Sequence, residues 1–520
     1  MIIKKDPMDK KSLLKELDSL GYSDRIKKVA ILGHDHRGST EYSGLLSLLL
    51  EDGAYEARLA LTGADVTQDA NVVVSALRHP LASIRNMAAG LLAKTASDAD
   101  IERELPDLSQ DCRRKLLRSV SHINRRELAE RLLPLLYDRW GAEEAVIILP
   151  ACSKDTVSQW LAEISYAIRD WNKLAGRHLD AVAEYFKTTL ESTPLREKGY
   201  VWWRFSSAME ILCNLKSDLM LECAMNHGPM DIIHPALKKQ LSTLVRLNPD
   251  RVYQLLIRAE SRSDLISHGI PEGILKRSKY LSIDQWTELA KLLVDYPIHI
   301  AKLLHHIAPS NRKVIFDAVY EEDKRQERIF PERLLYVLPH ALRDKEATRM
   351  LGLREIRDDR DRTIRIMACR SIHHSREKLE QATRASSADE RAMVLVQLIK
   401  STVLSRQGMD ETLVFLDRIK NDQDPVRGAV FIELSDSPAS VFTDTNLQEL
   451  TLLVDSVIDA RDSSHSTKFA VQHLAFAILR HNALHPHSEL FKFSLNTIQK
   501  LAKQNGQLSL PSLEENIPRG

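Results

Sequence analysis

One helical pattern recurs in this sequence and constrains its fold more than any other feature. Residues 79–94 read HPLASIRNMAAGLLAK, with Ile84, Ala88 and Leu92 at i, i+4 and i+8. Two later stretches repeat this apolar spacing, at Ile364, Ala368 and Ile372 and at Val426, Val430 and Leu434. Side chains four residues apart lie on one face of an α-helix. The pattern therefore predicts a repeated amphipathic helix and not a catalytic motif.

Amphipathic segments of this kind follow one another along the whole chain, separated by short polar connections. Each segment has one apolar stripe and is too short to be stable alone in water, so it needs neighbours that cover the stripe. A chain of 520 residues also exceeds what one compact core accommodates. Low aromatic content, 6%, and few glycines, 18, favour helices over strands. We predict an all-α fold, an α-α superhelix of stacked antiparallel helix pairs with on the order of eleven or twelve units.

The periodicity also predicts an order of domains. The stretch ESRSDLISHGIPEGILKRSKYLS at 260–282 interrupts the helical pattern. The last residues, 506–520, show no regular spacing of apolar residues. The predicted parts are an N-terminal cap and loop at 1–40, a first helical array at 41–260, an irregular hinge at 261–281, a second array at 282–505 and a flexible tail at 506–520.

The charge balance, the cysteines and the lengths of the apolar runs indicate where the protein is located and which general classes of partner it attracts. Lys and Arg number 73 against 72 Asp and Glu, so no overall field attracts the chain to nucleic acid or to a membrane. Five scattered cysteines without a CxxC pair are typical of reduced core residues. No apolar run approaches the roughly 20 residues that cross a bilayer, and the start lacks the apolar core of a signal peptide. We expect a soluble cytoplasmic protein, with the nucleus as the alternative.

Three stretches share a motif around the recurring helix. They are P-x-x-x-I-R-x-x-A at 80–88, D-R-T-I-R-x-x-A at 361–368 and D-x-D-P-V-R-x-x-V at 422–430. The motif resembles the second-helix signature of HEAT repeats, in which an Asp of the turn and the Arg after Val or Ile form a ladder between units. This resemblance implies a solenoid and gives Asp361 with Arg365, and Asp424 with Arg427, a structural role. The first stretch lacks the Asp, and the third follows the second by 62 residues, more than one unit.

A basic surface is the first candidate contact site. Residues 349–378 hold nine Lys or Arg against five Asp or Glu, an excess of four. Stacked helices would place several of these side chains on one surface, where they could meet phosphates or an acidic peptide. The alternative is a solvated face of mixed sign. The candidate contacts in this stretch are Arg354, Arg357, Arg360 and Arg362.

The aromatic cluster YVWWRF at 200–205 is the second candidate contact site. Adjacent residues of a helix point about 100° apart, so one of Trp202 and Trp203 can be in the core while the other lies on the surface beside Arg204. An exposed tryptophan beside an arginine is typical of a binding anchor. The alternative is that both tryptophans are buried between units.

A glycine-bounded stretch, GHDHRG at 33–38, is the candidate for metal binding. His34, Asp35 and His36 are ligand types that a divalent metal accepts. The alternative is a polar surface loop, which we expect because the sequence points to no further ligand.

These patterns predict a non-enzymatic scaffold or adaptor that binds a partner protein or peptide on the concave face of the helical array. The sequence has no GxGxxG, P-loop or GxSxG motif, so we expect no catalytic residue, cofactor or metal. One alternative is a nucleic-acid-binding protein, including a base-processing enzyme, that uses the Arg-rich stretch and the tryptophans. Another is a metal-dependent enzyme that uses His34 to His36. The oligomeric state is not predicted.

Overall fold

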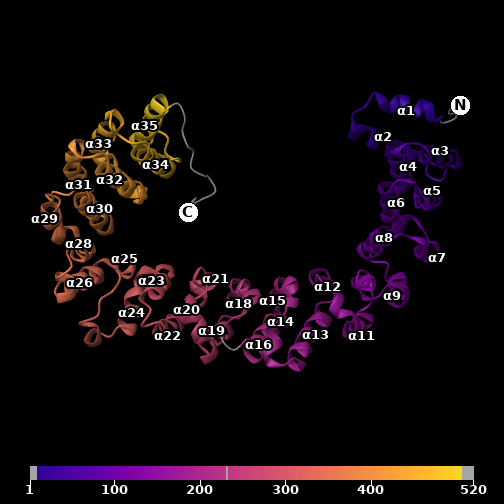
Figure 1. The fold of residues 1–520 in the computed structure, drawn as a ribbon, viewed down its shortest axis with the longest axis horizontal. Coiled ribbons are helices and arrows are strands. Elements are labelled where there is room, and N and C mark those ends of the chain that lie inside the picture. Colours follow the sequence, from indigo (N-terminus) through magenta and orange to yellow (C-terminus); the bar gives the residue numbers. More distant parts are fainter. Residues whose placement is uncertain (1–8, 230–231, 506–520) are drawn as a thin grey trace. The chain divides into compact units, whose positions relative to one another are not determined.

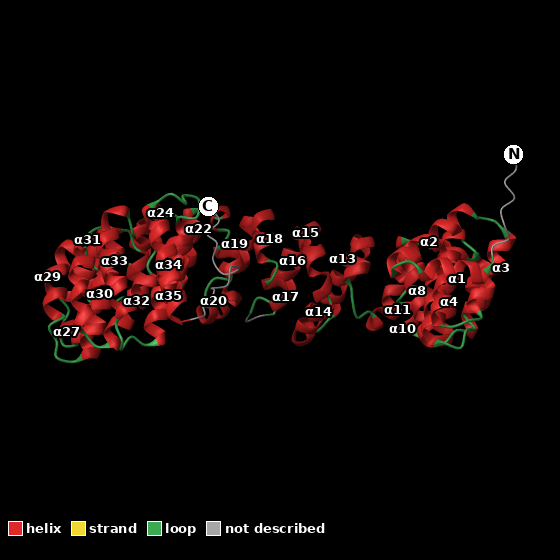
Figure 2. Ribbon diagram, turned by 90° about the horizontal axis from the view of Figure 1, so that it is seen from above, coloured by secondary structure: helices red, strands yellow, loops and turns green. Residues whose placement is uncertain are grey.

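The computed structural model describes residues 9–229 and 232–505. Within these residues the chain forms 35 α-helices and eleven short 3₁₀ helices, and it forms no strand (Figure 2). The all-α class that the apolar periodicity predicts is therefore confirmed. The predicted tail at 506–520 lies outside the described residues.

The chain divides into two compact units, residues 1–255 and 256–520. The predicted hinge at 261–281 begins just after this boundary and is helical in short pieces: α20 (Arg262–His268), α21 (Glu272–Leu275) and the 3₁₀ helix η7 (Ser278–Tyr280). Its role as a hinge stays a prediction.

The first unit contains the helices up to α18 and most of α19. Their bounds are α1 (Lys10–Asp18), α2 (Tyr22–Asp35), α3 (Thr40–Leu50), α4 (Ala54–Thr67), α5 (Ala70–Ala76), α6 (Ala82–Thr95), α7 (Asp98–Glu104), α8 (Gln110–Ile123), α9 (Arg126–Trp140), α10 (Ala142–Ala145), α11 (Lys154–Ile164), α12 (Asn172–Arg177), α13 (Leu179–Ser192), α14 (Lys198–Arg204), α15 (Met209–Leu215), α16 (Ser217–His227), α17 (Pro235–Lys238), α18 (Leu241–Leu247) and α19 (Pro249–Ile257).

Helices of the first unit pack on helices one to three places along the chain. α2, α4, α6 and α8 follow one another in a row, with α3 and α5 packed beside it (Figure 1). Ile84, Ala88 and Leu92 of α6 are completely buried, as their spacing predicts. Burial of such a stripe against neighbouring helices supplies the stability that a short helix lacks alone.

The second unit contains the remaining helices. Their bounds are α22 (Ile283–Leu292), α23 (Pro297–His306), α24 (Pro309–Val319), α25 (Glu332–Val337), α26 (His340–Leu351), α27 (Arg354–Arg357), α28 (Arg360–Ala368), α29 (Ile372–Ala382), α30 (Ala388–Ser405), α31 (Met409–Leu416), α32 (Asp424–Asp436), α33 (Leu447–Asp459), α34 (His465–His481) and α35 (Glu489–Asn505), after α20 and α21.

Packing in the second unit also follows the chain. α26, α28, α30, α32 and α34 pack each on the next, and α31, α33 and α35 form a second series. Val426, Val430 and Leu434 are buried in one apolar cluster with residues of α33 and α34. A continuous helix through 363–373 was expected, but α28 ends at Ala368 and Ile372 begins α29. Both segments still bury their apolar residues, because Ile364 and Ile372 share one cluster.

In six of the described helices, the arginine at the fourth position makes the same contact with the backbone. Its guanidinium donates to the carbonyl oxygen five residues earlier, just before the helix N-cap. The pairs are Arg25 with Leu20, Arg85 with Pro80, Arg113 with Leu108, Arg312 with Ile307, Arg343 with Leu338 and Arg391 with Ser386, at 2.7 to 3.4 Å. Each arginine thereby connects its helix, through a hydrogen bond, to the backbone of the connection that precedes it.

The ladder residues implied by the HEAT resemblance are only partly correct. Asp361 and Arg365 are both exposed and form no ion pair with each other or with another residue that the structure describes, so this pairing is wrong. Arg427 does contact Asp424 at 3.7 Å, but it lies closer to Asp462, at 2.7 Å. Arg365 is the sixth residue of α28, two positions later than the arginine in the six helices above. At that position it does not make the same contact with the connection that precedes its helix.

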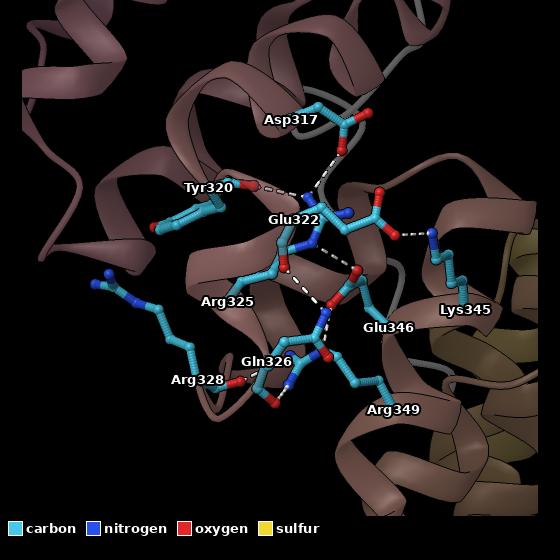
Figure 3. A network of polar contacts seen from close by, with 9 residues as sticks. All are labelled: Asp317, Tyr320, Glu322, Arg325, Gln326, Arg328, Lys345, Glu346 and Arg349. Carbon is cyan, nitrogen blue, oxygen red and sulfur yellow. Dashed lines mark hydrogen bonds and ion pairs between the residues drawn. The ribbon is translucent and has the colours of Figure 1, made fainter.

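A buried ion network joins η8 (Glu322–Arg325) to α26 in the second unit (Figure 3). Arg325 is 3% exposed and Glu346 is 1% exposed, with Arg325 Nε 3.0 Å from Glu346 Oε1. Arg349 Nε lies 2.9 Å from the other carboxylate oxygen of Glu346. Arg325 Nη1 also contacts Asp317 and the carbonyl of Tyr320, each at 2.8 Å. Buried charges with this many partners hold neighbouring segments together, which indicates a structural cluster.

Candidate functional site

α6 and α8 pack side by side and leave an open groove of about 800 Å³ along their shared surface. Its lining residues come from these two helices alone: Asn86, Met87, Gly90, Leu91 and Lys94 from α6, and Asp111, Arg114, Lys115, Arg118 and Ser119 from α8. A volume of this size is in the usual range of ligand-binding pockets.

Gly90 keeps the middle of the groove open. A Cβ atom added at Gly90 would lie 3.2 Å from Cε of Lys115, so the lysine side chain crosses the groove directly over the glycine. Glycine costs helix stability at such an interior position. Its presence here is explained by the space that it leaves for the side chain of Lys115.

The groove has an apolar floor between basic walls. Met87 and Leu91, four residues apart on α6, are half-buried and face into it. Four of the lining residues are Lys or Arg and only Asp111 is acidic. This combination can hold an apolar side chain and pair with carboxylates at the same time.

The four basic residues of the groove are not equivalent. Lys94 Nζ is 3.3 Å from Asp65, and Arg114 Nε is 2.9 Å from Glu144, so both charges are compensated within the protein. Lys115 and Arg118 are exposed, and neither forms an ion pair or a hydrogen bond with another residue in the described part of the chain. The groove therefore presents two cations that have no internal partner.

Positive charge continues from the groove toward the end of α8. Lys173 Nζ of α12 donates to Oγ of Ser121 at 2.8 Å, and Arg177 donates to the carbonyl of Ser121 at 2.6 Å. Burial, and then the charge of Arg177, lower the pKa of Lys173. Cations near helix C-terminal carbonyls are stabilising, which accounts for their position.

The sequence carries a signal of this site that the predictions above do not include. Residues 111–126 hold six basic residues and one acidic residue, an excess of five in a shorter stretch than 349–378. The sequence does not separate Arg113, which is buried against Glu144, or Arg125, which pairs with Asp98, from the unpaired Lys115 and Arg118.

The predicted basic surface at 349–378 is largely compensated. All four predicted contacts are exposed. Three form ion pairs, Arg354 with Asp358 at 3.3 Å, Arg360 with Glu390 at 2.9 Å and Arg362 with Glu355 at 3.2 Å. Arg357 forms none among the described residues. This is the arrangement of a mixed-sign surface, and a partner contact there stays a prediction.

The two adjacent tryptophans lie in different environments. Trp202 is completely buried, packs edge to face on Phe186 and donates from Nε1 to the carbonyl of His227 at 3.3 Å. Trp203 is 54% exposed, with its ring centroid 4.8 Å from that of His234. Arg204 lies over the ring of Trp171 at 5.5 Å. Burial of both tryptophans is therefore wrong, while contact of Trp203 with a partner stays a prediction.

The GHDHRG stretch is only partly the loop that was expected, because α2 extends through His34 to Asp35 and a turn follows at 36–38. His34 and Asp35 are exposed, with 3.6 Å between His34 Nδ1 and Asp35 Oδ1, and the ring of His36 stacks on Tyr42. A search of the described residues finds no group of three or more His, Cys, Asp or Glu positioned for a metal ion. His36 lies beyond the end of α2 with its ring on Tyr42, so only His34 and Asp35 lie close together, which is too few ligands for a metal site.

The five cysteines are all free and buried. Burial raises the pKa of Cys152, Cys213 and Cys223 to about 12, so these thiols stay protonated at neutral pH. A protonated thiol is a poor nucleophile. These side chains therefore act as small apolar residues of the core.

Comparison with known proteins adds no family to this description: a scan against protein-family models finds no match, and a search of the curated proteins finds none. Among the described residues, no helix combines the length and apolar character required to cross a membrane.

Proposed function

We propose that the protein is a non-enzymatic scaffold, a HEAT-like α-solenoid that binds a partner protein along the row of helices containing α6 and α8. Packing of successive helices in chain order supports the solenoid, as does the arginine that recurs at the fourth helical position. The contact of Arg391 with Asp422, 31 residues away, is of the ladder type.

The α6–α8 groove carries the proposal. Its apolar floor supplies area that a partner side chain can bury, and its two unpaired cations need no internal ion pair to be broken before they bind. Groove recognition of this kind is a common way for a helical surface to bind a peptide segment.

A protein partner suits the groove better than nucleic acid. None of the ten lining residues is aromatic, so the groove offers no ring on which a base could stack. Nucleic-acid affinity depends on many phosphate contacts, whereas only Lys115 and Arg118 are free in the groove.

Affinity capture with a groove-filling variant tests the proposal. Gly90→Tyr fills the groove, and Gly44→Tyr is the matched control, because Gly44 is also helical and an added Cβ there meets nothing within 4 Å. We expect the immobilised protein to capture a reproducible partner from lysate of the cells that produce it. Gly90→Tyr should reduce that partner about tenfold, and Gly44→Tyr should leave it unchanged. Equal capture by both variants, or no reproducible partner, would contradict the proposal.

A further inference from the structure

The charges of the groove define the chemistry of the segment that it accepts. Lys115 and Arg118 lie three residues apart on α8. This spacing places their side chains on the same helical face, with their Cβ atoms about 5 to 6 Å apart. Neither has an acidic partner among the described residues. A segment that satisfies both must carry carboxylates at a similar spacing, which a helix provides at i and i+3 or i+4.

The floor requires apolar side chains at the complementary spacing. Met87 and Leu91 lie four residues apart on α6, opposite the two cations across the groove. A helix that places apolar residues at i and i+4 over this floor would turn its adjacent face toward α8.

The charge distribution along α8 is asymmetric. Asp111, in the first turn, is the acidic residue of the lining, whereas Lys115 and Arg118 follow it and Lys173 and Arg177 lie beyond them. Carboxylates near Asp111 would be repelled, so the acidic part of a bound segment belongs at the end of the groove near Ser119.

From these observations we infer that the α6–α8 groove binds an acidic amphipathic helix, whose apolar residues cover Met87 and Leu91 and whose carboxylates pair with Lys115 and Arg118. This inference rests on the proposed function and specifies the chemistry of the partner.

Fluorescence anisotropy with defined probes tests the inference. The probe is a fluorescein-labelled helical peptide with Leu at i and i+4, two Glu one turn apart on the adjacent face toward one end, and Ala at the remaining positions. A second peptide has Gln in place of every Glu, and a labelled DNA duplex of similar length represents nucleic acid. The variant Lys115→Glu with Arg118→Glu reverses both free charges. Its matched control is Lys11→Glu with Lys15→Glu, which changes the net charge equally at two exposed lysines one helical turn apart on α1.

We expect the acidic peptide to bind the wild-type protein and the α1 variant equally. The α8 variant should bind it at least about tenfold more weakly, because two attractive pairs become repulsive. The Gln peptide should bind about as weakly to the wild-type protein, and higher salt should weaken the acidic peptide. Circular dichroism of both variants establishes that their helices are intact.

Four results would overturn the inference: no binding of the acidic peptide, equal binding by the α8 variant, equal binding of the Gln peptide, or tighter binding of the duplex. The lysate experiment separates this failure from failure of the scaffold function. If Gly90→Tyr abolishes capture while reversal of Lys115 and Arg118 leaves it intact, the groove binds a partner but not through acidic groups. If neither variant affects capture, both proposals fail.

Discussion

The guanidinium of Arg391 donates to both carboxylate oxygens of Asp422, from Nε at 2.9 Å and from Nη2 at 2.7 Å. The same side chain donates from Nη1 to the carbonyls of Ala385 and Ser386. One arginine thus links the connection before α30, the start of α30 and the connection before α32. Such bidentate, charge-assisted hydrogen bonds are among the stronger polar interactions in proteins.

Removal of the Asp422 charge should make the free energy of unfolding less dependent on pH in the acidic range. The hydrogen bond from Arg391 is the main cause that lowers the pKa of Asp422 below its ordinary value of 3.8. This interaction therefore stabilises the fold fully above pH 3.8 and is lost as the pH falls through the lower folded-state pKa. Asp422→Asn should cost about 1.5–3 kcal/mol at neutral pH and much less in strong acid, as measured by urea unfolding. An equal cost at both pH values would contradict this assignment.

Two glycines of neighbouring helices should respond oppositely to alanine. At Gly90 of α6 the nearest atom to an added Cβ belongs to the flexible Lys115 side chain, so Gly90→Ala should stabilise by about 0.5–1 kcal/mol. At Gly63 of α4 the added atom would lie 2.6 Å from Leu46 Cδ2 and 3.0 Å from the Tyr42 hydroxyl. Gly63→Ala should therefore destabilise by about 1–3 kcal/mol. Thermal unfolding monitored by circular dichroism measures both, and a shift of the same sign would contradict the described packing.

Two adjacent glutamates should differ widely in their contribution to stability. Glu144, 2% exposed, pairs with buried Arg113 at 2.9 Å, and Arg113 also lies over the ring of Trp140. Glu144→Ala leaves a buried guanidinium without its carboxylate and should cost about 3–5 kcal/mol. Glu143 is 59% exposed, and its ion pairs among the described residues are with Arg114 and Arg169 at the surface, so Glu143→Ala should cost at most about 1 kcal/mol. Similar costs in urea unfolding would show that the Arg113 pair is not buried in solution.

Alanine substitutions at the two adjacent tryptophans should differ in their effect on stability, because one ring is buried and the other is exposed. Trp202→Ala removes a completely buried ring and its hydrogen bond to His227, and it should cost about 3–5 kcal/mol. Trp203→Ala removes an exposed ring and should change stability by about 1 kcal/mol or less. The midpoints of thermal unfolding of the two variants give the comparison. A larger loss for Trp203 would reverse the orientation of α14 described above.

Thiol titration provides a test of burial throughout the chain. Because burial raises the pKa of Cys152, Cys213 and Cys223 to about 12, these thiols should react very slowly with a disulfide reagent in the folded protein. All five should react once the protein is unfolded in denaturant. Fast reaction of several thiols under native conditions would show that these core segments open readily.

The apolar spacing predicted several parts of the core correctly. Ile84, Ala88 and Leu92 are buried because four-residue spacing is a local property of the helix. The ladder was harder to predict, because Asp422, in the connection before α32, meets an arginine of α30 that is 31 residues away. Asp361 and Arg365 have a suitable sequence spacing, yet neither forms an ion pair with another described residue.

The sequence alone determined that the chain is helical and which face of each principal helix is apolar, because both follow from residues within about two turns of one another. Tertiary structure decided which charges remain available. Arg113, Arg114 and Lys115 are consecutive in the chain, but the first two share the buried carboxylate of Glu144, and the third has no ion-pair partner among the described residues. Glu144 lies about 30 residues further along the chain, in α10, so only the folded chain determines which of the three charges it compensates.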